Sequence, residues 1–236
     1  MKRFWQQATA EPVEGGGWGV ALDGRPLRTP ARARLAVPTE ALARAIAGEW
    51  AAVEGEVRPA AMPLTGLANA AIDRAGPDLA GQIAAFGESD LLCYRADGPA
   101  DLVALQAASW DPPLAWARTR FDIGFVLVTG VMHAPQPVAT VERLRAAVAA
   151  LDRFHLAGLH PVVTVSGSLV LGLALHEGAL EAEAVWQAGA LDALWQAERW
   201  GEDELAARER AGRRASLMAG ARFLALLDGR TPPPAD

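Results

Sequence analysis

The stretch GWGVALDGRPLRTP, residues 17–30, decides the fold, because it is the clearest β-hairpin pattern in the chain. Trp18, Val20 and Leu22 alternate with small residues, which is typical of a strand with one buried face. Asp23 and Gly24 then provide a two-residue turn before RPLRT. Because Gly and Pro punctuate the sequence on both sides, residues 2–38 are predicted to form a small antiparallel sheet.

A helix follows this sheet in the segment TEALARAIAGEWAAVEG, residues 39–55. Leu42, Ile46 and Trp50 recur at helical spacing, and Thr39 precedes the first turn as a potential N-cap. The helix is therefore expected to pack its apolar face on the sheet.

The rest of the chain is predicted to be helical, beginning after the prolines at 59 and 63. The helical segments are expected at 66–76, 77–89, 99–110, 112–121, 138–159, 167–178, 181–200 and 202–229. Asp111 and Pro112 are interpreted as the N-cap and first residue of the helix at 112–121. The β-branched segment IGFVLVTG, residues 123–130, is compatible with either a strand or the buried end of a helix.

These elements predict an α+β protein with two domains. A β-rich domain with one packed helix is expected at residues 1–62. A larger all-helical domain, an orthogonal bundle with a frayed C-terminal tail, is expected at residues 63–236. No repeat of fixed period is found, which argues against a solenoid.

The composition narrows the range of functions. With 236 residues, 51% of them apolar, the chain can bury its own core without metals or disulfides. The net charge of −6 provides no basic field for nucleic acid. The most apolar stretch, residues 162–175, is shorter than the roughly 20 residues that cross a bilayer. No membrane insertion is expected.

The location is predicted to be the cytoplasm. A single cysteine, Cys93, cannot form an internal disulfide and fits a reducing compartment. The first residues, MKRFWQQ, are not followed by the apolar segment of an export signal.

Motifs for catalysis and cofactor binding give no support for an enzyme. EGGGWGVALDG lacks the GK[ST] ending of a phosphate-binding loop, and VSGSLVLG is not the G-x-S-x-G of a nucleophile elbow. Ser166 or Ser168 is instead expected to be a helix N-cap, and Cys93 a buried, inert thiol. The spacing of the four histidines, at 133, 155, 160 and 176, does not match a zinc motif. No cofactor and no metal are predicted.

The acidic cluster in LWQAERWGEDELAAR, residues 194–208, is the remaining candidate site. Gly201 is expected to stop one helix, and Glu202, Asp203 and Glu204 are expected to occupy the first turn of the next. There they interact favourably with the helix dipole, by about 0.3–1 kcal/mol each. Glu204 can also pair with Arg208 across one turn. A helix start therefore explains the cluster without catalysis, and a binding role is favoured over an enzymatic one.

The order of eight fragments resembles a known family. They are KRFW (2–5), LDGRPLRTP (22–30), AIAGEW (45–50), MPLTGLANAAID (62–73), DLLCYRA (90–96), WDPPLAW (110–116), GSLVLGLAL (167–175) and WQAERWGEDE (195–204). Together they resemble the assembly chaperone of the F-type ATP synthase catalytic head that is dedicated to the alpha subunit. The start at MKRFW is similar to bacterial members, whose mitochondrial relatives need a transit peptide to reach the matrix.

The resemblance implies a chaperone that binds the free alpha subunit until a beta subunit replaces it. An unassembled ring subunit exposes apolar surface and aggregates, and reversible binding prevents this without ATP hydrolysis. The protein is then not an enzyme, and a monomer is expected because the chaperone needs a free face.

The resemblance also implies site residues. The acid three residues after the Trp–Gly pair, here Glu204, is implied to act on the partner, with Glu202 and Asp203 as neighbouring candidates. Trp50 matches a family tryptophan and is interpreted as structural. Trp200 is either structural or a contact residue.

Two alternatives stay open. A small-molecule enzyme could use Asp73, Asp90 and Glu204 in a cleft between the domains. A purely structural helical module would bind no ATP synthase subunit.

Overall fold

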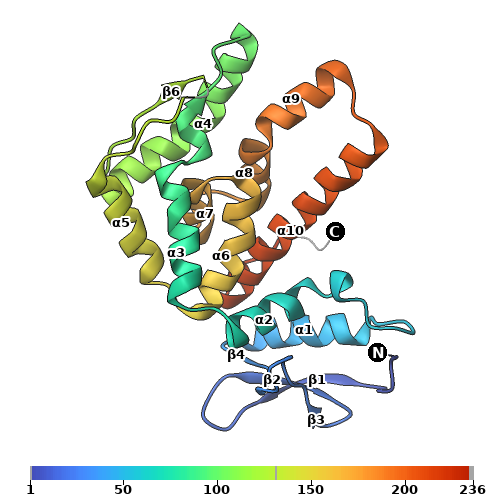
Figure 1. The fold of residues 1–236 in the computed structure, drawn as a ribbon. Helices are drawn as coiled ribbons and strands as arrows, with labels where there is room; N and C mark the ends of the chain where they lie inside the picture. Colours follow the sequence, from blue (N-terminus) through green and yellow to red (C-terminus); the bar gives the residue numbers. More distant parts are fainter. Residues whose placement is uncertain (1, 131, 234–236) are drawn as a thin grey trace.

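The computed structural model describes residues 2–130 and 132–233, and it confirms the predicted α+β class. Figure 1 shows three layers: the small sheet, then α1 and α2, then the larger group of helices. Helix α10 runs from a far corner of the helical part down to the layer of α1 and α2.

The N-terminal sheet is antiparallel and contains β1 (Ala8–Pro12), β2 (Trp18–Leu22), β3 (Arg25–Pro26) and β4 (Ala36–Val37). Strand β1 pairs with β2 along its full length, from Ala8 opposite Leu22 to Pro12 opposite Trp18. Strands β3 and β4 pair with the two ends of β2. Asp23 and Gly24 both have positive φ, +47° and +75°, as a tight hairpin turn requires. The predicted hairpin is therefore confirmed.

Helix α1 (Glu40–Ala51) covers the sheet as expected. The Thr39 hydroxyl accepts a hydrogen bond from the Leu42 N–H and caps the helix. Leu42, Ile46 and Trp50 are buried, which confirms the predicted apolar face.

The helical part begins with a short 3₁₀ turn, Pro59–Ala61, and contains nine α-helices among the described residues. Their bounds are α2 (Pro63–Asp73), α3 (Pro77–Ala85), α4 (Ala100–Phe121), α5 (Val138–Ala149), α6 (Arg153–Ser166), α7 (Leu169–His176), α8 (Ala182–Gly189), α9 (Leu191–Trp200) and α10 (Glu204–Leu227). Two 3₁₀ turns, Phe86–Glu88 and Leu91–Cys93, join α3 to the region before α4.

The predicted break at Asp111 and Pro112 is wrong, because α4 continues through both positions. Pro112 and the following proline remove two N–H donors, which leaves the carbonyls of Ala108 and Ser109 without their usual partners. Ala108 is exposed and Ser109 is half-buried, so water can reach this side of the helix. Trp110, fully buried, holds the helix in place and donates a hydrogen bond from Nε1 to the Ala188 carbonyl, 2.9 Å away.

Two of the predicted long helices are each divided in two. The segment 138–159 breaks before Arg153, where the Asp152 carboxylate accepts hydrogen bonds from the first backbone N–H groups of α6. The segment 181–200 breaks at Ala190, which has a non-helical φ of −100°. The open segment 123–130 contains a strand, β6 (Val128–Thr129), which pairs in parallel with β5 (Tyr94–Arg95).

The two parts of the molecule share one hydrophobic cluster. Phe154 of α6 and Phe223 and Leu226 of α10 pack with the core of the sheet and α1. The Thr39 hydroxyl also donates to the Leu226 carbonyl at 2.9 Å. Helix α2 packs against α1, α6 and α10. The boundary between residues 62 and 63 stays a prediction.

The chain after α10 is anchored at its start. Arg230 donates from Nη1 to the Leu175 carbonyl at 3.0 Å. Part of the predicted frayed tail, residues 234–236, lies outside the described residues. Within residues 2–130 and 132–233, no helix is long and apolar enough to cross a bilayer.

Candidate partner-binding surface

The candidate surface is the corner between α9 and α10, at the end of the helical part far from the sheet (Figure 1). Gly201 ends α9 with φ of +77°. The Asp203 carboxylate accepts a hydrogen bond from the Ala206 N–H at 2.8 Å and is the N-cap of α10. Glu204 is the first helical residue, and Glu202 precedes the cap. The prediction that all three acids lie in the first turn is therefore wrong for Glu202 and Asp203, because the helix begins two positions later than expected, at Glu204.

Two large apolar side chains are exposed at this corner. Trp200, the last residue of α9, is 73% exposed, and Leu205, in the first turn of α10, is 67% exposed. Burying such side chains against another protein is favourable, and tryptophan is enriched among residues that dominate binding energy. Both ends of the turn between α9 and α10 therefore present a large apolar side chain that no other described element covers.

The corner is held in place by contacts with the start of α4. Trp195 is buried and packs edge-to-face with Trp200, with ring centroids 5.4 Å apart. Arg199 lies over the Trp195 ring, 4.6 Å from its centroid, and forms an ion pair with Asp101. Trp195 Nε1 also donates to Asp101. The buried Trp195 and its contacts with Arg199 and Asp101 therefore fix the position of Trp200.

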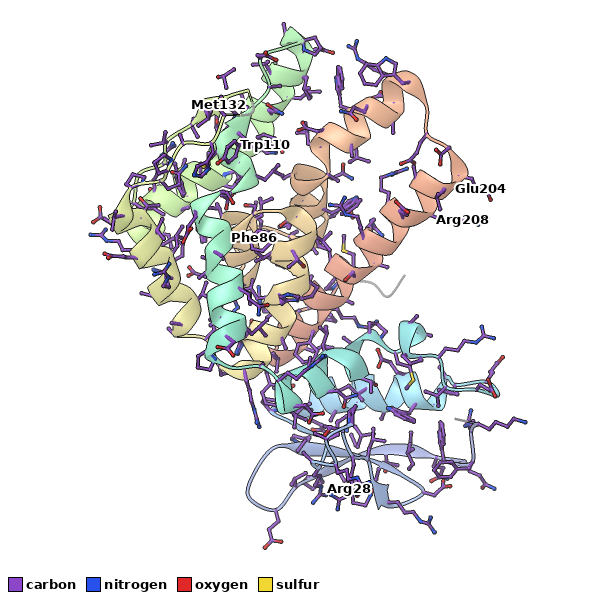
Figure 2. The ribbon with its side chains drawn as sticks, viewed as in Figure 1. Arg28, Phe86, Trp110, Met132, Glu204 and Arg208 are labelled. Carbon is purple, nitrogen blue, oxygen red and sulfur yellow. The ribbon has the colours of Figure 1, made fainter. Side chains whose placement is uncertain are left out.

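The acids of the corner form ion pairs that leave Glu204 accessible. Glu202 pairs with Arg210 at 2.6 Å, and hydrogen bonds from that guanidinium lower the pKa of the Glu202 carboxyl. Glu204 pairs with Arg208 at 2.5 Å, as predicted, yet its side chain is 81% exposed. Figure 2 shows both residues on the outer side of α10. Glu204 therefore points away from the helical core.

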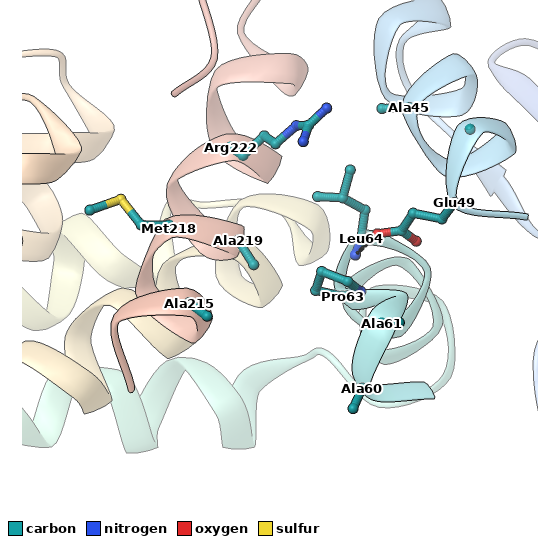
Figure 3. A pocket seen from close by; sticks show the side chains of 11 residues that line it. Ala45, Glu49, Ala60, Ala61, Pro63, Leu64, Ala215, Met218, Ala219 and Arg222 are labelled. Atoms are coloured by element: carbon teal, nitrogen blue, oxygen red, sulfur yellow. Dashed lines mark hydrogen bonds between the residues drawn. The ribbon is translucent and has the colours of Figure 1, made fainter. Parts of the chain in front are cut away.

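A cavity of about 530 Å³ lies between the two parts of the molecule (Figure 3). Residues of α10, among them Met218 and Arg222, line one side, and Glu49, Pro63 and Leu64 line the other. The Glu49 carboxylate accepts hydrogen bonds from the Leu64 N–H and from the backbone and hydroxyl of Thr65. Burial raises the pKa of Glu49. This carboxylate is engaged in capping α2.

The acids of the alternative enzyme do not meet in this cavity. Asp73 accepts hydrogen bonds from the Thr29 hydroxyl and the Ala31 N–H. Asp90 is fully buried and accepts from backbone N–H groups at the starts of a 3₁₀ turn and of α7. Glu204 lies at the outer corner. The geometry gives two of these carboxylates structural roles and brings no pair of the three together.

Other candidates from the sequence are placed in the core. Trp50 is buried, packs edge-to-face with Trp5 at 5.2 Å, and accepts a hydrogen bond from Trp5 Nε1 at its carbonyl. This burial and packing support the structural interpretation of Trp50, which stays a prediction. Cys93 is buried, and burial raises the pKa of its thiol to about 12. Ser168 caps α7, as one of the two serines was expected to do.

Sequence reasoning did not identify Leu205 or Trp195 as parts of this surface. Leu205 directly follows the acids, and a leucine in a helix is usually expected to face the core. Its exposure depends on how α9 and α10 meet, which the sequence pattern does not show. Trp195 and its partner Asp101 are 94 positions apart in the chain. No local spacing could have joined them.

The comparisons with known proteins agree with the resemblance. Residues 2–118 match the model of the ATP12 chaperone protein family. The mitochondrial protein atp12 of Schizosaccharomyces pombe is 27% identical over 219 residues, covering 86% of this chain and 75% of that protein.

Two solved bacterial structures share the fold over nearly the whole chain. Atp12 from Paracoccus denitrificans has 45% sequence identity and a TM-score of 0.89, with 96% of this chain and 98% of that chain covered. The Atu1473 protein of Agrobacterium tumefaciens has 42% identity and a TM-score of 0.90, with 96% of this chain and 86% of that chain covered. The resemblance suggested by the sequence is confirmed: this chain belongs to the ATP12 family of chaperones, which act in assembly of the ATP synthase.

Proposed function

We propose that this chaperone binds the unassembled alpha subunit of the ATP synthase through the α9–α10 corner and keeps it from aggregating until a beta subunit takes its place. The observation that carries the proposal is the exposure of Trp200 at the end of α9, and of Leu205 and the Glu204 carboxylate in the first turn of α10. Membership of the ATP12 family supports a role in assembly of the ATP synthase. The choice of the alpha subunit as the partner comes from the sequence resemblance.

The chemistry of the corner favours a particular kind of partner surface. Trp200 and Leu205 would bury apolar area that a free ring subunit exposes. Glu204 and its neighbours would favour a basic rim around that area and disfavour an acidic one. Glu202 and Asp203 support the corner through the Arg210 ion pair and the helix cap, and their charges add to the acidic rim.

The proposed action needs no catalytic step and no cofactor. Binding a client in its folded, unassembled form lowers the concentration of the aggregating species by mass action alone. We propose a monomeric cytoplasmic protein that is not an enzyme, because the α9–α10 corner must stay free for the client.

The test is light scattering of the purified alpha subunit during refolding, with and without the chaperone. Wild-type protein is expected to suppress scattering near equal molar ratio. Glu204→Lys is expected to weaken alpha binding at least tenfold, because it reverses the charge at the rim. Glu209→Lys makes the same change of charge five positions along the same exposed helix and is expected to retain activity.

Trp200→Ala tests the apolar part of the surface. The loss of an aromatic anchor is expected to weaken binding by about 2 kcal/mol or more. Equal activity of the wild type, Glu204→Lys and Trp200→Ala would contradict the surface. Failure of wild-type protein to bind alpha would contradict the choice of partner.

A further inference from the structure

Three side chains that could ligate a metal meet at the junction of α6, α7 and α10. His155 lies in the first turn of α6, His176 is the last residue of α7, and Asp228 directly follows α10. Each offers one ligand atom, and the three atoms lie within 4.8 Å of one another. The two imidazole rings are 5.2 Å apart between centroids.

The surroundings of His155 match those of a metal-ligating histidine. Its Nδ1 lies 2.8 Å from an Asp152 carboxylate oxygen, and its Nε2 lies 2.9 Å from Asp228 Oδ1. Metal-bound histidines commonly donate their second ring N–H to a carboxylate, which fixes the ring and raises its basicity. Asp152 already occupies that position, while Nε2 faces Asp228.

One ring nitrogen of His176, Nδ1, is buried without a hydrogen-bond partner in the described part of the chain. Buried polar atoms are rarely left unpaired, because desolvation costs free energy that no bond returns.

The two carboxylate oxygens of Asp228 face different side chains, Arg230 and His155. Arg230 donates to Oδ2 at 2.7 Å, and Oδ1 faces His155. Arg230 itself is fixed by the Leu175 carbonyl. A metal ion could therefore take Oδ1 without displacing the arginine from Oδ2.

We propose that His155, His176 and Asp228 form a binding site for a divalent transition-metal ion of the zinc type, with water as a fourth ligand. Two imidazoles and one carboxylate are a common zinc ligand set, with bond lengths of roughly 2.0–2.2 Å. Ligand atoms around a tetrahedral ion with such bonds lie about 3.3–3.6 Å apart. Separations of up to 4.8 Å therefore have to shorten by roughly 1 Å, which side-chain rotations can provide. The ion displaces the proton that His155 Nε2 shares with Asp228, and this proton is released to solvent.

Sequence spacing could not predict this site, because its ligands lie in α6, in α7 and just after α10, and they include no paired-histidine motif. The ion would join the C-terminal end of α10 to the start of α6 and the end of α7. This is the same end of α10 at which Leu226 accepts the hydrogen bond from Thr39. Metal binding is therefore expected to stabilise the junction between the helical part and the sheet.

The experiment uses full-length protein treated with a chelator and then titrated with zinc chloride against a chromogenic indicator. One equivalent is expected to bind, with a rise in the thermal unfolding midpoint. Asp152→Asn is expected to weaken binding about 10–100-fold, as losses of such supporting carboxylates do. His133→Ala, which removes an exposed histidine outside the cluster, is expected to change nothing.

The ligand variants decide the outcome. His176→Ala and Asp228→Asn are each expected to lose stoichiometric binding. Asp228→Asn is the safer variant if His176→Ala fails to fold, because the asparagine keeps a hydrogen-bond acceptor for His155. Substitution with Co²⁺ is expected to give the visible spectrum of a tetrahedral histidine site, absent from Asp228→Asn. Binding below one equivalent in wild type, or equal affinity in wild type and Asp228→Asn, would overturn the proposal.

Discussion

At the scale of single residues, neighbouring acids at the α9–α10 corner have different tasks. Asp203 caps α10, whereas Glu204 makes only an exposed ion pair. We expect Asp203→Ala to lower the free energy of unfolding by about 0.5–2 kcal/mol, because one N–H of the first turn loses its acceptor. Glu204→Ala should change it by less than about 0.5 kcal/mol. Urea denaturation followed by circular dichroism measures both.

Asp203→Asn separates capping from charge at the same position. Asparagine caps a helix about as well as aspartate, so stability should be retained. If this variant also binds alpha normally, Asp203 acts through the cap. Weakened binding at unchanged stability would show that its charge contributes to the surface.

Asp90 predicts a pH dependence of stability. Burial raises the pKa of its carboxyl to about 6, although N–H groups and the Ser168 hydroxyl bond to it. The unfolded value is about 3.9, so between these values the folded state binds more protons and stability falls as pH rises. Asp90→Asn has no titrating carboxyl at this position. The difference in the free energy of unfolding between the wild type and this variant should therefore decrease by roughly 2–3 kcal/mol from pH 4 to pH 7. A cost that grows with pH would show that the N–H donors outweigh burial.

At the scale of the elements, α6 and α10 approach closely because each has a glycine at the contact. A Cβ added to Gly220 would lie 2.6 Å from the Gly158 carbonyl oxygen and 2.7 Å from Pro161. Backbone and a proline ring cannot move aside easily, so Gly220→Ala is expected to destabilise the protein by about 1–3 kcal/mol.

Gly212→Ala is the matched control on the same helix. Nothing lies within 4 Å of its added Cβ, and alanine is the better helix former. This variant should be more stable than wild type by about 0.5–1 kcal/mol. Equal effects at the two positions, measured by thermal unfolding, would contradict the close crossing.

Elements were predictable where local chemistry decides them. The turn at Asp23 and Gly24 and the cap at Thr39 depend on residues a few positions apart. The helix break predicted at Pro112 is wrong, because the tertiary packing of Trp110 outweighs the loss of two helical hydrogen bonds. The α9–α10 corner was predicted as a helix stop and start, but its exposed face was not, since exposure depends on contacts such as Trp195 with Asp101.

At the scale of the whole molecule, α10 connects the candidate surface with the shared core. Its 24 residues span about 36 Å, from Glu204 at the corner to Leu227 at the layer of α1 and α2. Phe223 and Leu226 belong to the cluster that also contains Leu42 and Ile46 of α1. The corner is therefore carried by a helix whose other end is fixed in the N-terminal core.

The shared core predicts that the two parts unfold together. Phe223 is fully buried, and Phe223→Ala should lower the free energy of unfolding by about 3–5 kcal/mol. Tryptophan fluorescence and far-ultraviolet circular dichroism should give the same urea midpoint in the wild type, and the same lower midpoint in the variant. If fluorescence and circular dichroism separate in wild type, the parts unfold independently. If they separate only in Phe223→Ala, this side chain is the link, because its removal uncouples a sheet and a helical bundle that otherwise share one core.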